Sequence, residues 1–256
     1  MTKAAGRRGV WSSRSPVSLF PLGAARAPAG ARRRRHQRIV VASTSLAGAT
    51  LLHSTFSSRP GSRRFYALTF ATAGTWVVGG LAEPTVHRSD PASADRPGGS
   101  FLAPIGVAIL AFGAFYGAAL AARRVPVLDE AITEVMRYSH LGSGPLVTLS
   151  SLANGLGEEL FFRGAVYSAA GTFSPVAVST AVYAGTTIAT GNPALTLASL
   201  VMGTLFAFER RRSGGVRASV LTHLMWSGLM LRYLPPLFDQ VHRPDRQPPR
   251  RRWLRQ

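Results

Sequence analysis

Residues 157–164 read Gly157-Glu158-Glu159-Leu160-Phe161-Phe162-Arg163-Gly164, which places two adjacent carboxylates and a guanidinium close together. The surrounding residues 146–170 hold no other charged side chain and are numerous enough to cross a bilayer as a helix. Ionisable groups at membrane depth are costly to bury, so such a cluster predicts a functional site by default. We therefore expect the chemistry of this protein to centre on residues 158–163.

Most apolar residues fall in blocks of the length that a membrane-crossing helix needs. Seven blocks meet this description, at 39–58, 65–82, 101–122, 146–170, 173–190, 194–208 and 216–234. In the third block, the spacing Gly113-x-x-x-Gly117 favours close contact with another helix in lipid. These patterns predict an all-α fold, a polytopic membrane helix bundle with about seven transmembrane helices.

The formal net charge is +19, and most of it lies in two tails. Residues 1–38 hold ten Lys and Arg without an acid, and residues 239–256 hold six Arg against two Asp. Basic clusters beside a bilayer are attracted to anionic lipid head groups by roughly 1 kcal/mol per residue. We expect the tails to contact such lipids and expect no nucleic-acid binding, because no basic module rich in aromatic residues is present.

Two further features limit the possibilities. The chain has no cysteine, which excludes disulfides, thiolate nucleophiles and Cys-based metal sites. The basic leader and the loop at residues 210–212 both favour the cytoplasmic side, but seven spans would leave the Arg-rich C-terminal tail outside. The orientation in the membrane therefore stays open.

Residues four apart share a face of a helix, so Glu159 and Arg163 are predicted to form an ion pair. That pairing leaves Glu158 to handle a water or a metal as a general base. A second polar group in an apolar block is His223, with Ser227 one turn later on the same face. The alternative is purely structural: a Glu–Arg pair can hold two membrane helices together, and a lone histidine often satisfies a neighbouring polar group.

Residues 158–164 resemble the first motif of the CAAX prenyl protease and bacteriocin-processing (CPBP, Abi-type) family of intramembrane metalloproteases. That family's pattern is Glu-Glu-x-x-x-Arg, then aromatic-x-x-x-His, then His-x-x-x-Asn on a later helix. Residues 222–227, Thr222-His223-Leu224-Met225-Trp226-Ser227, resemble the third motif, and the resemblance covers about residues 145–234. Two positions depart from the pattern: Thr187 stands where the second-motif histidine belongs, and Ser227 stands where asparagine belongs.

The resemblance implies a site in which Glu158 activates a water. It assigns Glu159, Arg163 and His223 to the same site, with Ser227 as a weaker hydrogen-bonding substitute and Thr187 in place of the histidine. It also implies Glu158 and His223 as ligands of a possible divalent metal, zinc. Catalytic zinc commonly has three protein ligands and threonine is a poor one, so we do not expect a tightly held metal.

The charge and hydropathy patterns, together with the resemblance over the last part, divide the chain. The expected parts are a basic disordered N-terminal tail (1–38), N-terminal transmembrane helices (39–123), an amphipathic interfacial helix (124–144), a CPBP-like protease domain (145–238) and a basic C-terminal tail (239–256). The resemblance also implies a multi-pass integral membrane protein of a bacterial cell membrane.

The implied function is hydrolysis of peptide bonds in membrane-associated or lipidated substrate tails. The enzyme would then work without metal or weakly, or His140 would replace the missing histidine. The alternative is a catalytically impaired member of the family that acts as a membrane peptide-binding or scaffold protein. A small transporter is disfavoured, because no paired broken helices are evident in the sequence.

Overall fold

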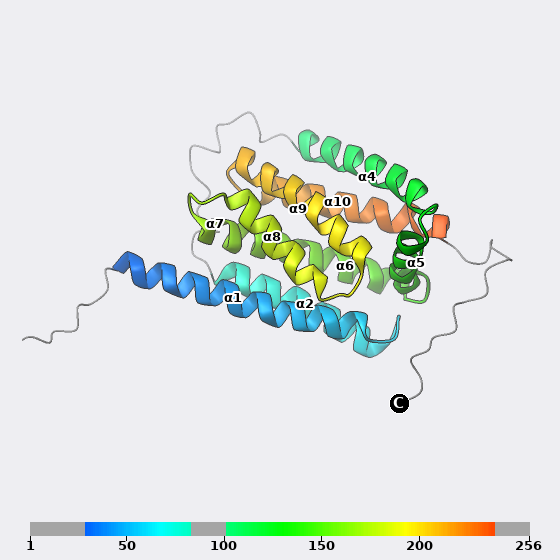
Figure 1. Ribbon diagram of the computed structural model, residues 1–256, viewed down its shortest axis with the longest axis horizontal. Coiled ribbons are helices and arrows are strands. Elements are labelled where there is room, and N and C mark those ends of the chain that lie inside the picture. Colours follow the sequence, from blue (N-terminus) through cyan, green and yellow to red (C-terminus); the bar gives the residue numbers. More distant parts are fainter. Residues whose placement is uncertain (1–28, 83–100, 239–256) are drawn as a thin grey trace, which may run out of the picture.

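The computed structural model describes residues 29–82 and 101–238, and these residues form helices joined by short connections (Figure 1). The all-α class expected from the sequence is confirmed for this part of the chain. Residues 1–28 of the expected N-terminal tail and all of the expected C-terminal tail (239–256) lie outside the described residues.

In the first half, residues 29–82 and 101–140 contain four helices: α1 (Ala29–Phe56), α2 (Arg63–Leu81), α4 (Leu102–Ala122) and α5 (Pro126–His140). Helix α1 begins at Ala29, so the expectation of a disordered tail up to residue 38 is wrong for residues 29–38. Arginine has a high helix propensity, and the run of arginines there continues the helix beyond the apolar block.

The second half contains α6 (Gly144–Glu158), the π-helix η2 (Glu159–Val166), α7 (Tyr167–Ala170), α8 (Pro175–Ile188), α9 (Pro193–Ser213), α10 (Arg217–Tyr233) and the 3₁₀ turn η3 (Pro235–Phe238). Proline lies in the first turn of α5, α6, α8 and α9, where its fixed φ suits a helix start and its missing N–H costs nothing. Each of the seven apolar blocks coincides with a helix or a run of helices.

In the described residues, two helices are long and apolar enough to cross a membrane, namely the Arg32–Phe56 part of α1 and all of α4. The expected number of about seven spans therefore stays a prediction. The close helix contact expected at Gly113 and Gly117 is not made by the described part of the chain, where a Cβ at either position would meet no heavy atom within 4 Å.

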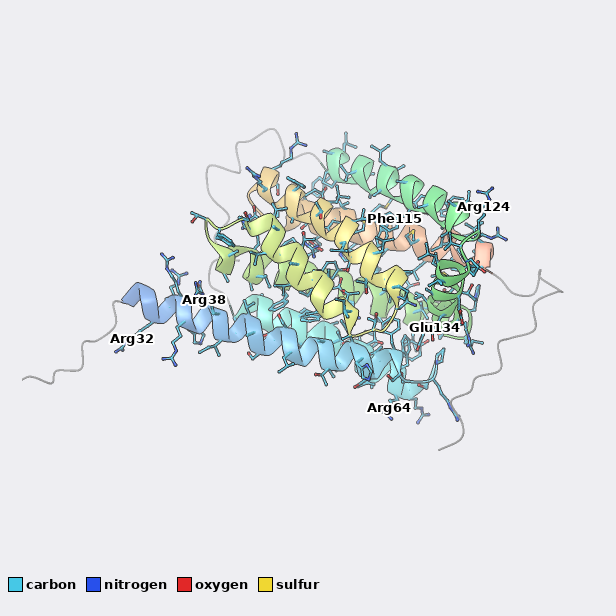
Figure 2. The ribbon with its side chains drawn as sticks, in the orientation of Figure 1. Arg32, Arg38, Arg64, Phe115, Arg124 and Glu134 are labelled. Atoms are coloured by element: carbon cyan, nitrogen blue, oxygen red, sulfur yellow. The ribbon has the colours of Figure 1, made fainter. Side chains whose placement is uncertain are left out.

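Charged side chains lie at both ends of the bundle (Figure 2). Arg32 and Arg38 lie at the end where α1 begins, and Arg64, Arg124 and Glu134 lie at the opposite end, whereas Phe115 on α4 lies between the two. Two charged ends with an apolar stretch between them are the distribution that favours a position across a bilayer.

Aromatic and glycine residues bring α2 against the helices that carry the acidic pair. Trp76 is completely buried, and its ring lies 5.1 Å from that of Phe161 and 5.0 Å from that of Phe162. A Cβ at Gly157 would lie 2.8 Å from the carbonyl oxygen of Ala73, so the absence of a side chain permits the close approach of α6 to α2. Helices α8, α9 and α10 pack around η2 from its other sides, which puts the acidic pair inside the bundle.

Candidate active site

The backbone changes from an α-helix to a π-helix between the two glutamates. Glu158 is the last residue of α6 and Glu159 is the first residue of η2. Single π-helical turns are rare and occur often at functional sites. The wider turn also separates consecutive side chains by a smaller angle than an α-helix does, so both carboxylates face the interior of the bundle.

Glu159 is completely buried, and one of its carboxylate oxygens, Oε1, has two partners. Its side chain has 0% exposure, and its Oε1 lies 3.1 Å from Nη1 of Arg163, which is equally buried. The same Oε1 lies 3.0 Å from Nδ1 of His223 on α10. The ion pair expected from the four-residue spacing is therefore present, and it is joined by the histidine.

Arg163 is fixed by contacts that leave it little freedom. Its Nη2 donates to the carbonyl oxygen of Gly203 at 3.2 Å, and its Cζ lies 4.6 Å from the ring centre of Tyr183 and 5.1 Å from that of Phe206. A guanidinium over aromatic faces is stabilised by cation–π attraction. A Cβ at Gly203 would come within 3.5 Å of Nη2, so this glycine leaves room for the guanidinium.

Glu158 differs from Glu159 because its side chain is partly exposed to solvent. Its side chain keeps 16% exposure. Its Oε2 accepts a hydrogen bond of 2.7 Å from the hydroxyl of Tyr183 and lies 4.0 Å from Nε2 of His223. Glu158 is therefore the carboxylate of the pair that a water or a substrate can contact.

His223 lies between the two glutamates. Its ring stacks on that of Phe206 with centroids 4.6 Å apart, and its Nδ1 faces Glu159. Because Nδ1–H donates to the Glu159 carboxylate, the neutral imidazole carries its lone pair on Nε2, and Nε2 faces Glu158. The arrangement presents a carboxylate and a basic nitrogen to the same small space.

Comparison with known proteins identifies the region that carries these residues. Residues 141–229 match the family model described as type II CAAX prenyl endopeptidase Rce1-like. This region is an Rce1-like (CPBP) family domain. The resemblance seen in residues 158–164 and 222–227 is thus confirmed, and the family is one of integral membrane proteins. Neither a curated protein nor a solved structure matches the chain.

The Rce1-like domain brings together four of the residues expected at its site: Glu158, Glu159, Arg163 and His223. Thr187 instead donates to the carbonyl oxygen of Tyr183 at 2.8 Å, one turn back along α8. In residues 29–82 and 101–238, no hydrogen bond joins Ser227 to the four. The roles assigned to Thr187 and Ser227 remain predictions.

Three other polar residues lie outside this group of four: Asn154, His53 and His140. The side-chain amide of Asn154 donates to the carbonyl oxygens of Thr69 and Ser150, which ties α6 to α2. Nδ1 of His53 lies 3.1 Å from the carbonyl oxygen of Ala189. His140 is the exposed last residue of α5.

Sequence reasoning gave no site role to two residues of the Rce1-like domain. Tyr183 contacts Glu158, whereas the sequence placed it only at the aromatic position of the second motif, four residues before Thr187. Glu209 accepts a hydrogen bond of 2.7 Å from Thr222, the neighbour of His223. Glu209 follows the apolar block 194–208, and burial raises the pKa of its carboxyl to about 7.

The donor set of the Rce1-like domain does not fit a tightly held zinc ion. The described part of the chain contains no group of three His, Cys, Asp or Glu side chains arranged to hold a metal. Glu158 and Nε2 of His223 supply two donors, whereas Oε1 of Glu159 already contacts Arg163 and Nδ1 of His223. Since catalytic zinc commonly takes three protein ligands, we derive no chemical step through a metal.

Proposed function

We propose that this protein is a membrane-embedded endopeptidase in which Glu158 activates the water that hydrolyses a peptide bond. One observation supports this proposal above the others: the two adjacent glutamates differ in exposure and pairing. Glu159 is sealed and neutralised by Arg163, whereas Glu158 is partly exposed and shares a small space with Nε2 of His223. A purely structural pair needs only one of the two carboxylates.

The distance between Oε2 of Glu158 and Nε2 of His223 suits a bridging water. At 4.0 Å it is too long for a direct hydrogen bond. A water between the two atoms can donate to the carboxylate and contact the imidazole at the same time. That water is held beside a base, which is the arrangement general-base catalysis requires.

The proposed reaction is a hydrolysis in two stages. The water oxygen forms a bond to the peptide carbonyl carbon while Glu158 takes the water proton. The tetrahedral intermediate then collapses, the carbon–nitrogen bond breaks, and the proton passes from Glu158 to the leaving nitrogen. The products are a carboxylic acid and an amine, so no further reactant is needed.

The substrates we propose are peptide tails at the membrane surface, lipidated ones among them. The matched family is described as type II CAAX prenyl endopeptidase, and α1 and α4 are long and apolar enough to hold the chain in a bilayer. We also propose that the other apolar helices cross the membrane, for about seven spans in all.

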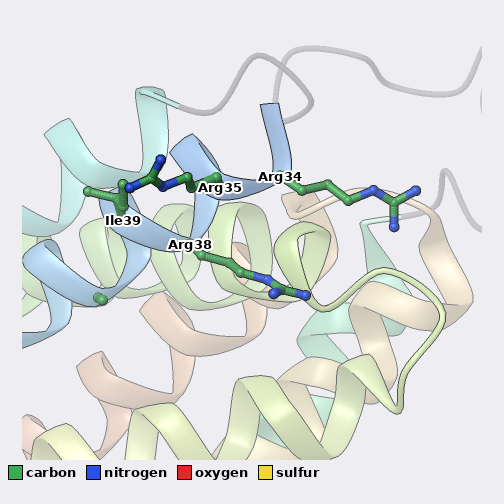
Figure 3. Close-up of a pocket in the computed structure, with 5 residues that line it drawn as sticks. Arg34, Arg35, Arg38 and Ile39 are labelled. Carbon is green, nitrogen blue, oxygen red and sulfur yellow. The ribbon is translucent and has the colours of Figure 1, made fainter. Parts of the chain in front are cut away.

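Anionic lipid head groups are the partners we propose for the start of α1. Arg34, Arg35 and Arg38 line a shallow pocket together with Ile39 there, next to the apolar part of the helix (Figure 3). Replacing the three arginines with glutamine is expected to reduce the amount of phosphatidylglycerol that co-purifies with the protein. An unchanged amount would contradict the lipid contact.

The test of the function is cleavage of a farnesylated peptide ending in a CAAX sequence by the purified protein in liposomes. Glu158→Gln is expected to lower the rate at least about 100-fold, because general-base catalysis contributes about 10²- to 10⁴-fold. Glu130→Gln, on the exposed face of α5, is the matched control and is expected to leave the rate unchanged. A Glu158→Gln protein as fast as the parent would contradict the mechanism.

A second candidate function is a family member that binds membrane peptides without cleaving them. The observation in its favour is Thr187, whose hydroxyl is used by the backbone of its own helix. In that case the parent protein binds the farnesylated peptide but releases no product. Glu158→Gln then changes neither binding nor product formation.

A further inference from the structure

We propose that Tyr183 on α8 is the positioning residue for Glu158, because its hydroxyl holds Oε2 of the carboxylate at 2.7 Å. The inference rests on the proposed hydrolytic function and adds a residue to it. Tyr183 does not contact the attacking water in this arrangement; it acts through Glu158.

The ring of Tyr183 is itself held on several sides. Its centre lies 4.8 Å from the ring centre of Phe162 and 4.6 Å from Cζ of Arg163. A Cβ at Gly203 would lie 3.1 Å from Cδ1 of the tyrosine, which shows how closely α9 approaches the ring. Because these contacts already hold the phenol in place, its hydroxyl can orient the carboxylate with little further loss of conformational entropy.

The same arginine links the two glutamates through this ring. Arg163 pairs with Glu159 on one side and lies over the Tyr183 face, while the Tyr183 hydroxyl binds Glu158. The sealed pair therefore supports the tyrosine, and the tyrosine supports the reachable carboxylate. This chain of contacts gives Glu159 and Arg163 a part in placing Glu158, although in the described residues neither side chain forms a hydrogen bond or ion pair with that of Glu158.

A structural role for the Tyr183 bond is the competing explanation. Helix α8 is already attached to η2 by another bond, because the buried hydroxyl of Ser179 donates to the carbonyl oxygen of Phe162 at 2.7 Å. Helix α8 also packs along α9. The tyrosine bond is thus not needed to dock α8, and it ends on the one carboxylate that stays reachable.

One carboxylate oxygen can accept two hydrogen bonds, so Oε2 can bind Tyr183 and a water together. With the phenol in place, the carboxylate cannot rotate freely away from Nε2 of His223. Small misplacements of a catalytic group cost about 100-fold in rate. Loss of the phenol is therefore expected to act on the chemical step and not on substrate binding.

The experiment compares Tyr183→Phe with Tyr138→Phe in the liposome assay with the farnesylated CAAX peptide. Both changes delete one hydroxyl that donates a short hydrogen bond, since Tyr138 donates to the carbonyl oxygen of Phe56 at 2.8 Å, away from the site. Tyr183→Phe is expected to lower kcat by about 10- to 100-fold with KM within twofold of the parent. Tyr138→Phe is expected to lower the melting temperature and leave kcat unchanged.

Three outcomes would overturn the inference. If Tyr183→Phe has the same kcat as the parent while Glu158→Gln is inactive, Tyr183 has no positioning role. The proposed function is then unaffected. An equal fall of kcat in both tyrosine variants points to a structural effect. A Glu158→Gln protein with parent activity, or a parent protein that does not cleave the peptide, contradicts the proposed function and this inference together.

A second measurement needs neither turnover nor a folded Tyr183→Phe variant. The resonance Raman doublet of tyrosine reports whether a phenol donates a strong hydrogen bond. Comparing the parent with Glu158→Gln is expected to show one tyrosine that changes from a strong donor to a weak one, because a neutral amide oxygen accepts more weakly than a carboxylate. Identical spectra would show that the Tyr183–Glu158 bond is not formed.

Discussion

Nδ1 of His223 lies 3.0 Å from Oε1 of Glu159, which joins α10 to the first residue of η2. The bond settles the direction of the imidazole, because a ring held at Nδ1 directs Nε2 to the other side, toward Glu158. Nδ1 of His223 thus has Glu159 as a structural partner, whereas Nε2 lies beside the partly exposed carboxylate of Glu158. The two nitrogens can be tested separately.

Replacing His223 with asparagine is expected to stop hydrolysis while the protein stays stable. The asparagine amide nitrogen can take the place of Nδ1 and donate to Glu159, but nothing replaces Nε2. We expect the rate to fall about 10²- to 10⁴-fold and the free energy of unfolding to change by less than about 1 kcal/mol. Peptide cleavage and chemical unfolding in detergent measure the two quantities.

His223→Leu is the matched comparison. It removes both nitrogens and leaves Glu159 short of one donor, so the free energy of unfolding is expected to fall by about 1–3 kcal/mol. Parent activity in the asparagine variant would show that Nε2 has no part in the reaction.

Arg163→Met is expected to destabilise the protein strongly. Both Arg163 and Glu159 are completely buried, and the change leaves an unpaired carboxylate inside the bundle. Breaking such a pair costs about 3–5 kcal/mol. The control is Arg211→Met, at an exposed position near the end of α9, which is expected to have little effect. Circular dichroism during unfolding in detergent measures both, and equal stabilities would contradict the pairing.

Features that depend on the spacing of residues along the chain could be predicted from the sequence. The seven apolar blocks lie in helices, as their length predicted, since apolar runs of more than about 10–12 residues favour helices over strands. The Glu159–Arg163 pair followed from residues four apart sharing a face. The position of His223 at the site followed from the resemblance to a known motif.

The sequence did not predict what depends on contacts between helices. The π-helix at Glu159 changes the backbone hydrogen-bond register, and apolar periodicity does not report that register. Tyr183 and Glu158 are 25 residues apart on different helices, so only the packing of α8 shows that they meet. The start of α1 at Ala29 was missed because charge was taken as a sign of disorder in a segment with high helix propensity.

Gly157→Ala is expected to disturb the contact between α6 and α2. The added Cβ would lie 2.8 Å from the carbonyl oxygen of Ala73 and 3.1 Å from Cβ of Trp76, so the helices must separate. Such overpacking costs about 1–3 kcal/mol of unfolding free energy. Because Glu158 is the next residue, cleavage activity is expected to fall as well.

Gly74→Ala on α2 is the control for this prediction. A Cβ at Gly74 meets no heavy atom within 4 Å, and alanine in a helix interior is more stable than glycine by roughly 0.5–1 kcal/mol. We therefore expect opposite signs for two identical substitutions next to the same interface. Equal effects would show that the close approach at Gly157 is absent.

Glu209 is expected to make stability depend on pH. Burial raises the pKa of its carboxyl from 4.5 to about 7 in the folded protein, with Glu159 acting in the same direction and Thr222 and Arg163 opposing it. Between these two values the folded protein holds a proton that the unfolded chain has released. Stability from this group is therefore fully present below about pH 4.5, decreases as the pH rises, and is lost above about pH 7.

Glu209→Gln removes this titration, so the variant is expected to lose less stability than the parent between pH 5 and pH 7, within the window that the two pKa values define. Glu130→Gln, exposed on α5, is expected to follow the parent over the same range. Unfolding curves at a series of pH values measure the difference. Parallel curves for the parent and Glu209→Gln would mean that the Glu209 carboxylate ionises as readily in the folded bundle as in the unfolded chain, and Thr222 would then bind a charged partner beside His223 throughout this range.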